Sequence, residues 1–120
     1  MSDWEFTIPG NKPSVNHMYL PGRTVGSRRK APGVEAWQTG VAYIVRSARP
    51  SGWMPARRTV IEVEWYTQRW ADSDNGFKAL SDAIAAGLGC DDKGFLMRAM
   101  VNEVDKANPR TVVRVTNAIE

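Results

Sequence analysis

The most constraining feature of this sequence is the segment 59–67, TVIEVEWYT, in which apolar and polar side chains largely alternate. A period of two residues places successive side chains on opposite faces, so the segment predicts a strand with one face against a core. Segments with helical character flank it. Residues 34–48 repeat apolar side chains at helical spacing, and residues 77–89 combine good helix formers with terminal glycines. Strands separated by helices pair through crossovers rather than tight turns, so a sheet with helices packed on it is expected.

Three further segments, 4–8, 95–104 and 111–116, also carry strand patterns. The sequence DKANPR at 105–110 predicts a hairpin loop, and therefore an antiparallel pairing of the last two strands. Residues 9–33 are rich in Pro, Gly and basic side chains and predict a long loop. The expected order is β-α-β-α-β-β in an α+β fold with a mixed sheet. We expect a single domain, residues 1–120, because a chain of this length can bury one core.

Charge is divided unevenly along the chain. Residues 1–60 hold nine Lys and Arg against three Asp and Glu, whereas residues 61–120 hold seven against ten. This asymmetry suggests that one half holds a polyanion and the other processes it, although ordinary solvated charge gives the same counts. The single cysteine, Cys90, excludes a disulfide framework and a Cys-rich zinc site. The sequence starts without a signal-peptide pattern and has no apolar stretch near the ~20 residues of a membrane span, so we expect a cytoplasmic protein with no membrane partner.

The octapeptide ADSDNGFK places Asp72, Asp74 and Asn75 just before the second predicted helix. Counted from Asp72, an EF-hand calcium loop would need glycine at position six and glutamate at position twelve. Gly76 falls at position five and Ala83 at position twelve, so this kind of calcium loop is excluded.

Two interpretations of the acidic turn remain open. In the first, Asp74 caps the helix and Asp72 favours the helix dipole. In the second, the turn binds a metal, because two carboxylates spaced two residues apart on extended backbone point to one side. A second acidic pair, Asp91 and Asp92, follows the helix. If the two turns meet, their crowded carboxylates require a divalent cation, and oxygen ligands without His or Cys favour Mg²⁺ or Mn²⁺, as at phosphodiester-cleaving sites.

Taken together, these residues resemble the RusA family of Holliday-junction resolvases, small phage- and prophage-associated endonucleases. The family pattern D-x-D-N-x-x-K, then D-A-[LI] on a helix, then D-D, is matched at Asp72, Asp74, Asn75, Lys78, Asp82-Ala83-Ile84 and Asp91-Asp92. The N-terminal pattern P-S-x-N-x-x-Y is matched at Pro13, Ser14, Asn16 and Tyr19. The sequence departs from the family at Gly76, where Leu is common, and at Gly94, where Gln is common.

The resemblance implies a homodimeric endonuclease that cuts branched DNA, the four-way junction, by paired symmetric nicks in a bacterial host cell, with Mg²⁺ or Mn²⁺ as cofactor. It implies that Asp72, Asp74 and Asp92 bind the metal and that Lys78 completes the catalytic set. Asn75, Asp91 and Asp82 are expected to support the site. A slip of one residue in the alignment would exchange Asp91 with Asp92.

The predicted DNA contacts are basic side chains suited to phosphate: Arg23, Arg28, Arg29, Lys30, Lys12 and Arg69. Trp53 and Trp70 could stack on unpaired bases at a junction centre, with core or dimer packing as the other interpretation for each. Two alternatives to a resolvase stay open. One is a nuclease that trims other DNA structures, and the other is a non-catalytic nucleic-acid-binding module of the same fold.

Overall fold

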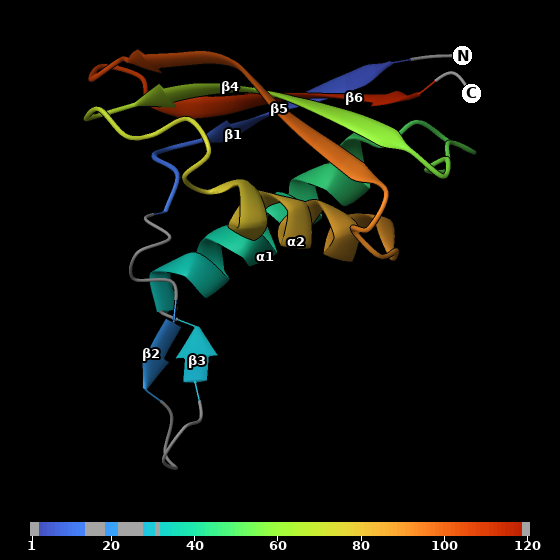
Figure 1. Ribbon diagram of the computed structural model, residues 1–120, viewed down its shortest axis with the longest axis horizontal. Coiled ribbons are helices and arrows are strands. Elements are labelled where there is room, and N and C mark those ends of the chain that lie inside the picture. Colours follow the sequence, from blue (N-terminus) through green and yellow to red (C-terminus); the bar gives the residue numbers. More distant parts are fainter. Residues whose placement is uncertain (1–2, 14–18, 22–27, 31, 119–120) are drawn as a thin grey trace.

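The computed structural model describes residues 3–13, 19–21, 28–30 and 32–118 of the chain. Its centre is a four-stranded mixed sheet with two helices on one face (Figure 1). Across the sheet the strand order is β1-β6-β4-β5. The elements are β1 (Trp4–Pro9), α1 (Pro32–Ala48), β4 (Thr59–Thr67), α2 (Phe77–Leu88), β5 (Phe95–Val104) and β6 (Arg110–Asn117). The α+β class and the predicted order β-α-β-α-β-β are confirmed.

Strand β4 is an inner strand of the sheet, and the burial of its side chains alternates along its whole length. Ile61, Val63 and Trp65 are fully buried between the sheet and the helices. Glu62 and Glu64 lie at the alternate positions and are only partly covered. The main core joins these side chains to apolar residues of β1, β6 and both helices. Burying one face and leaving the other solvated is what a period-two pattern achieves in a sheet.

The predicted hairpin between the last two strands is wrong. Strand β4 lies between β5 and β6, pairing parallel with β5 and antiparallel with β6. The segment after β5 therefore crosses the end of β4, where the Asp105 N–H donates to the Thr67 carbonyl oxygen at 2.8 Å. Burial explains the arrangement: β6 has buried side chains at alternate positions, whereas most of β5 is exposed and suits an edge.

The prediction of a long loop over residues 9–33 missed two short strands. Tyr19–Pro21 form β2 and Arg28–Lys30 form β3, and the two pair antiparallel as a separate small sheet. Figure 1 shows this pair extending away from the main sheet. A three-residue strand is too short for a periodic signal, so its pattern could not be recognised among the Pro, Gly and basic residues.

The two helices pack against each other at a point that requires a glycine. A Cβ added to Gly87 of α2 would lie 2.7 Å from the carbonyl oxygen of Ala42 and 2.8 Å from the Cβ of Val45, both in α1. Both distances are shorter than a Cβ atom normally makes with any heavy atom, so the close approach of the two helices depends on the missing side chain. Within the part of the chain described, neither helix has the length and apolarity needed to cross a membrane.

We expect Gly87→Ala to lower the free energy of unfolding by about 1–3 kcal/mol, because overpacking a tight contact forces backbone shifts. The matched control is Gly40→Ala, which lies in α1 with nothing within 4 Å of the added Cβ. That variant should gain about 0.5–1 kcal/mol from lower chain entropy. Chemical denaturation measures both, and a stabilised Gly87→Ala protein would contradict the packing described.

Candidate functional site

The segment between β4 and α2, residues 68–76, is called the acidic loop below. Asp72 and Asp74 both have exposed side chains here. The backbone turns at this point: the Asn75 N–H donates to the Asp72 carbonyl oxygen at 3.1 Å, and the Phe77 N–H to that of Asp74 at 3.2 Å. The expectation that both carboxylates lie on an extended strand end is therefore wrong, because the strand ends at Thr67.

The helix-capping interpretation of Asp74 is not supported by the geometry. The residue at the N-cap of α2 is Gly76, and no side chain forms a capping hydrogen bond. Gly76 has a φ of 104°, which is the left-handed region, and an added Cβ would lie 3.3 Å from the side chains of Lys12 and Trp65. The left-handed φ is what favours glycine here, and the added Cβ would also fit tightly against the two side chains. This explains the departure from the leucine common in the family at this position.

Side-chain donors from other segments hold the backbone of the acidic loop. Four of its carbonyl oxygens accept hydrogen bonds of this kind, so the loop can lie against the core without leaving those carbonyl groups unsatisfied. The bonds run from Lys12 Nζ to Asp72 (2.8 Å), from Trp65 Nε1 to Ser73 (2.6 Å), from Asn102 Nδ2 to Ala71 (2.9 Å) and from Thr67 Oγ1 to Arg69 (2.6 Å).

Lys12 is the most unusual member of this set. It is only 9% exposed, and its ammonium lies 4.2 Å from the centroid of the Trp65 ring. Burial lowers the pKa of this ammonium to about 8, against the opposing attraction of the Asp74 and Asp72 carboxylates. Lys12 therefore places a positive charge within electrostatic reach of both acids. The phosphate contact predicted for it stays a prediction.

A second charged cluster surrounds Lys78 in the first turn of α2. Its ammonium lies 2.9 Å from Asp82 Oδ1 and 3.5 Å from Asp92 Oδ2. The hydrogen bond with Asp82 raises the pKa of Lys78. Ser81 Oγ donates to Asp92 Oδ2 at 3.0 Å, and this bond is the main cause that lowers the pKa of the Asp92 carboxyl. Sequence reasoning placed Asp82 beside Lys78 correctly but missed Ser81, whose signal is its i+3 spacing from Lys78.

The two acidic turns adjoin different ends of β4, but Asp92 of the second turn contacts Lys78 in the first turn of α2. Strands β4 and β5 are parallel with Thr59 opposite Phe95, so the turn before Phe95 lies near the start of β4 and the acidic loop follows its end. Asp91 Oδ1 accepts from the Lys93 N–H at 2.9 Å, a bond within its own turn. Among the residues that the structure describes, no three His, Cys, Asp or Glu side chains converge as ligands of one ion.

The acidic loop by itself still has a donor set that fits Mg²⁺. This ion is commonly held by one or two carboxylates, with water and substrate phosphate at its other positions. Asp72 and Asp74 supply two exposed carboxylates on one short turn. Their hard oxygen atoms match the ion's preference, whereas Asp92 is held with Lys78 and Ser81.

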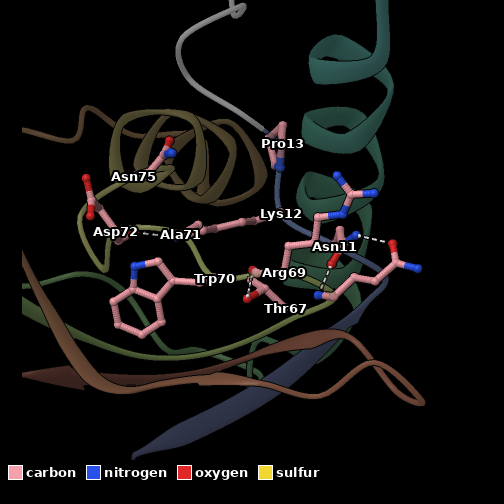
Figure 2. A pocket seen from close by; sticks show the side chains of 10 residues that line it. Asn11, Lys12, Pro13, Thr67, Arg69, Trp70, Ala71, Asp72 and Asn75 are labelled. Atoms are coloured by element: carbon pink, nitrogen blue, oxygen red, sulfur yellow. Dashed lines mark hydrogen bonds between the residues drawn. The ribbon is translucent and has the colours of Figure 1, made fainter.

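Beside the acidic loop lies an open cleft of about 600 Å³ (Figure 2). Its walls come from residues 11–13 of the N-terminal segment and from residues 67–72 and 75. Both Arg69 and Trp70 line it and are exposed. Trp53 is instead 8% exposed and packs edge-on against Trp4, which confirms core packing for this residue rather than stacking on DNA.

The remaining predicted contacts lie in the N-terminal half. Arg28, Arg29 and Lys30 form β3, of which the structure describes the backbone only. Arg23 lies outside the described residues, as do Ser14 and Asn16 of the N-terminal pattern.

Comparison with known proteins adds one finding to this geometry. A family model described as "Endodeoxyribonuclease RusA" matches residues 9–116 of the 120 residues. The matched range contains the acidic loop, the cluster around Lys78 and the cleft. A search of the curated proteins finds no match.

The bond between Ser81 and Asp92 leads to a pH prediction. Since this bond is the main cause lowering the Asp92 pKa, Ser81→Ala should raise that pKa toward its ordinary value of 3.8. A depressed carboxyl pKa stabilises the fold above pH 3.8, and the stabilisation is lost as the pH falls through the folded-state pKa. Carboxyl-carbon NMR titration of the metal-free protein measures the shift. Ser47→Ala, at an exposed position in α1, is the control, and equal Asp92 titrations in both variants would contradict the assignment.

Proposed function

The chain belongs to the RusA family of endodeoxyribonucleases, and from that premise we propose that it resolves four-way DNA junctions by paired symmetric nicks in a reaction that depends on Mg²⁺. The family match establishes the nuclease class across nearly the whole chain. The metal, the symmetry of cutting and the roles of individual residues are proposals, and they are supported by the arrangement around the acidic loop.

The observation that carries the proposal is the state of Asp74. Its carboxylate does not cap α2, because Gly76 occupies the cap position without any side-chain bond. Asp72 and Asp74 are exposed on a loop whose backbone is fixed by other residues. Two carboxylates two residues apart repel each other, and a bound cation would relieve that repulsion. Metal binding is therefore the function that best accounts for both carboxylates.

The proposed reaction is hydrolysis of a phosphodiester. A water oxygen bonds to phosphorus, one P–O ester bond breaks, and the leaving sugar oxygen receives a proton. A Mg²⁺ ion bound by Asp72 and Asp74, with Mn²⁺ able to replace it, would lower the pKa of this water and neutralise phosphate charge. The role proposed for Asn75 is to support the loop, and its N–H already closes the turn on Asp72.

Lys78 is proposed to act as a cation rather than as a base. The raised pKa caused by Asp82 keeps the ammonium protonated near neutral pH. A protonated lysine cannot accept a proton from water, but it can stabilise the negative charge that develops on the phosphate. In this proposal Asp82 and Asp92 orient the ammonium, while Asp92 remains a candidate metal ligand and Asp91 closes its turn.

We propose a two-fold symmetric homodimer because resolution requires two nicks in opposed strands. Two equivalent sites related by a dyad match the approximate symmetry of a four-way junction. Each chain would contribute one acidic loop. The alternative, a non-catalytic binding module of the same fold, draws support from the fact that no three potential ligands converge in the described residues.

Replacing each acid should separate DNA cleavage from DNA binding. Asp72→Asn and Asp74→Asn should reduce Mg²⁺-dependent cleavage of a synthetic four-way junction by several orders of magnitude, because each removes a charged ligand. Junction binding without metal should persist or tighten, because less negative charge then faces the phosphates. Asp92→Asn and Lys78→Ala should also lose cleavage. Gel assays of cleavage and binding on the junction and on a linear duplex measure these effects.

The control is Asp91→Asn, which keeps the side-chain oxygen that accepts from Lys93 and should retain activity. Unfolding free energies of the Asp72 and Asp74 variants should stay within about 0.5 kcal/mol of wild type, as for other exposed positions. Active Asp72→Asn and Asp74→Asn proteins would overturn the site assignment. A wild-type protein that binds the junction but never cuts it would favour the binding module.

The strand β3 carries the densest basic run, and we propose that Arg28, Arg29 and Lys30 contact DNA phosphates. Replacing all three with Ala should flatten the slope of log affinity against log salt by about two to three units, since each phosphate contact contributes about one. Arg57→Ala with Arg58→Ala, two exposed cations before β4, is the control. An unchanged slope in the β3 variant would show that this strand does not contact the backbone.

A further inference from the structure

Trp70 is the feature of the cleft that the proposed chemistry leaves unexplained. Its side chain is 69% exposed, although Trp4, Trp53 and Trp65 are each at most 8% exposed. The fold thus buries these three indoles and holds this one in solvent. An exposed indole forgoes a large apolar contact area, so a site that keeps one open commonly uses it to bind a flat partner.

The surroundings of Trp70 define the chemistry of that partner. The same cleft is lined by Arg69, Lys12 and Asp72. Figure 2 shows the indole of Trp70 and the carboxylate of Asp72 toward one side of the cleft and Arg69 with Asn11 toward the other. A ligand in the cleft would therefore meet an aromatic face and cations while lying next to the proposed metal-binding acids.

The cleft also holds a fixed pair of polar side chains. Asn11 Nδ2 donates to Gln68 Oε1 at 3.2 Å, and the Gln68 backbone N–H donates to Asn11 Oδ1 at 2.7 Å. An amide nitrogen has two donor hydrogens and an amide oxygen has two lone pairs, so this pair keeps hydrogen-bonding capacity for a ligand. Such groups match the edge of a nucleobase, and a guanidinium matches its phosphate.

We propose that this cleft binds one unstacked nucleotide of the DNA strand beside the cutting site, with its base on the indole of Trp70, its edge toward Asn11 and Gln68, and its phosphate toward Arg69. The inference rests on the proposed junction-cutting function and adds a base-binding site to it. Bases of a continuous duplex are stacked on both faces and cannot enter, whereas a branch point supplies bases that can be displaced at low cost. The cleft would thus contribute to the choice of branched over linear DNA.

The test uses four-way junctions that carry a single 2-aminopurine at each nucleotide flanking the branch point in turn, in buffer without divalent metal. Wild type should change the emission at one of these positions. Trp70→Leu should lose that change and bind the junction about 5- to 150-fold more weakly, the range for losing one base–aromatic stack. Trp70→Phe keeps an aromatic face and should retain most of the emission change and most of the junction affinity. Neither variant should change binding to linear duplex.

The matched control is Tyr43→Leu, which removes an aromatic side chain that is 68% exposed on α1; it should bind as wild type does. A Trp70→Leu protein with wild-type affinity and emission would overturn the base site and leave the proposed nuclease function intact. A Trp70→Leu protein that is monomeric in light scattering where wild type is dimeric would assign the indole to a protein interface and also overturn the proposal. A wild-type protein that binds no junction would overturn the proposed function, and the base site with it.

Discussion

The rest of the site depends on side chains that satisfy the backbone of the acidic loop. A loop lying against a core would ordinarily bury carbonyl groups at a cost, since an unpaired buried acceptor loses its hydrogen bonds to water. Here Lys12, Trp65 and Asn102 come from three different segments and donate to consecutive carbonyl oxygens at residues 72, 73 and 71. The backbone is therefore fixed without help from Asp72 or Asp74, whose carboxylates stay exposed.

The same bonds explain why a buried lysine is tolerated. Removing an ammonium from water is costly, and the lowered pKa of Lys12 reflects that cost. The cost of burying the ammonium is offset by its hydrogen bond to the Asp72 carbonyl, by the Trp65 ring and by the attraction of both acids. Lys12 thus links the N-terminal segment to the acidic loop and closes one wall of the cleft. Any change in this residue would alter the loop, the charge around it and the cleft together.

The sequence was sufficient to predict the elements whose apolar pattern repeats over many residues. The period of two in β4 and the helical spacing in α1 and α2 gave those elements within two residues of their ends. The position of β6 could not be predicted, because it depends on which of the last two strands buries more side chains and not on the turn at 105–110. Likewise the family pattern proposes Asp72, Asp74 and Lys78 as site residues, but the contact of Ser81 with Asp92 and the buried state of Lys12 arise between distant segments. Periodicity and motifs carry no information on such contacts.

Helix α2 connects the two acidic turns, which adjoin different ends of β4. It begins just after the acidic loop, and its first-turn residue Lys78 reaches Asp92 and Asp82 by its side chain. Asp92 is in turn held by Ser81, one helical turn beyond Lys78. The charge of Asp92 therefore acts on Lys78 whether or not Asp92 ever contacts a metal. The place of Asp92 in the family pattern fits both orienting the lysine and binding a metal, and in this structure its carboxylate contacts the lysine.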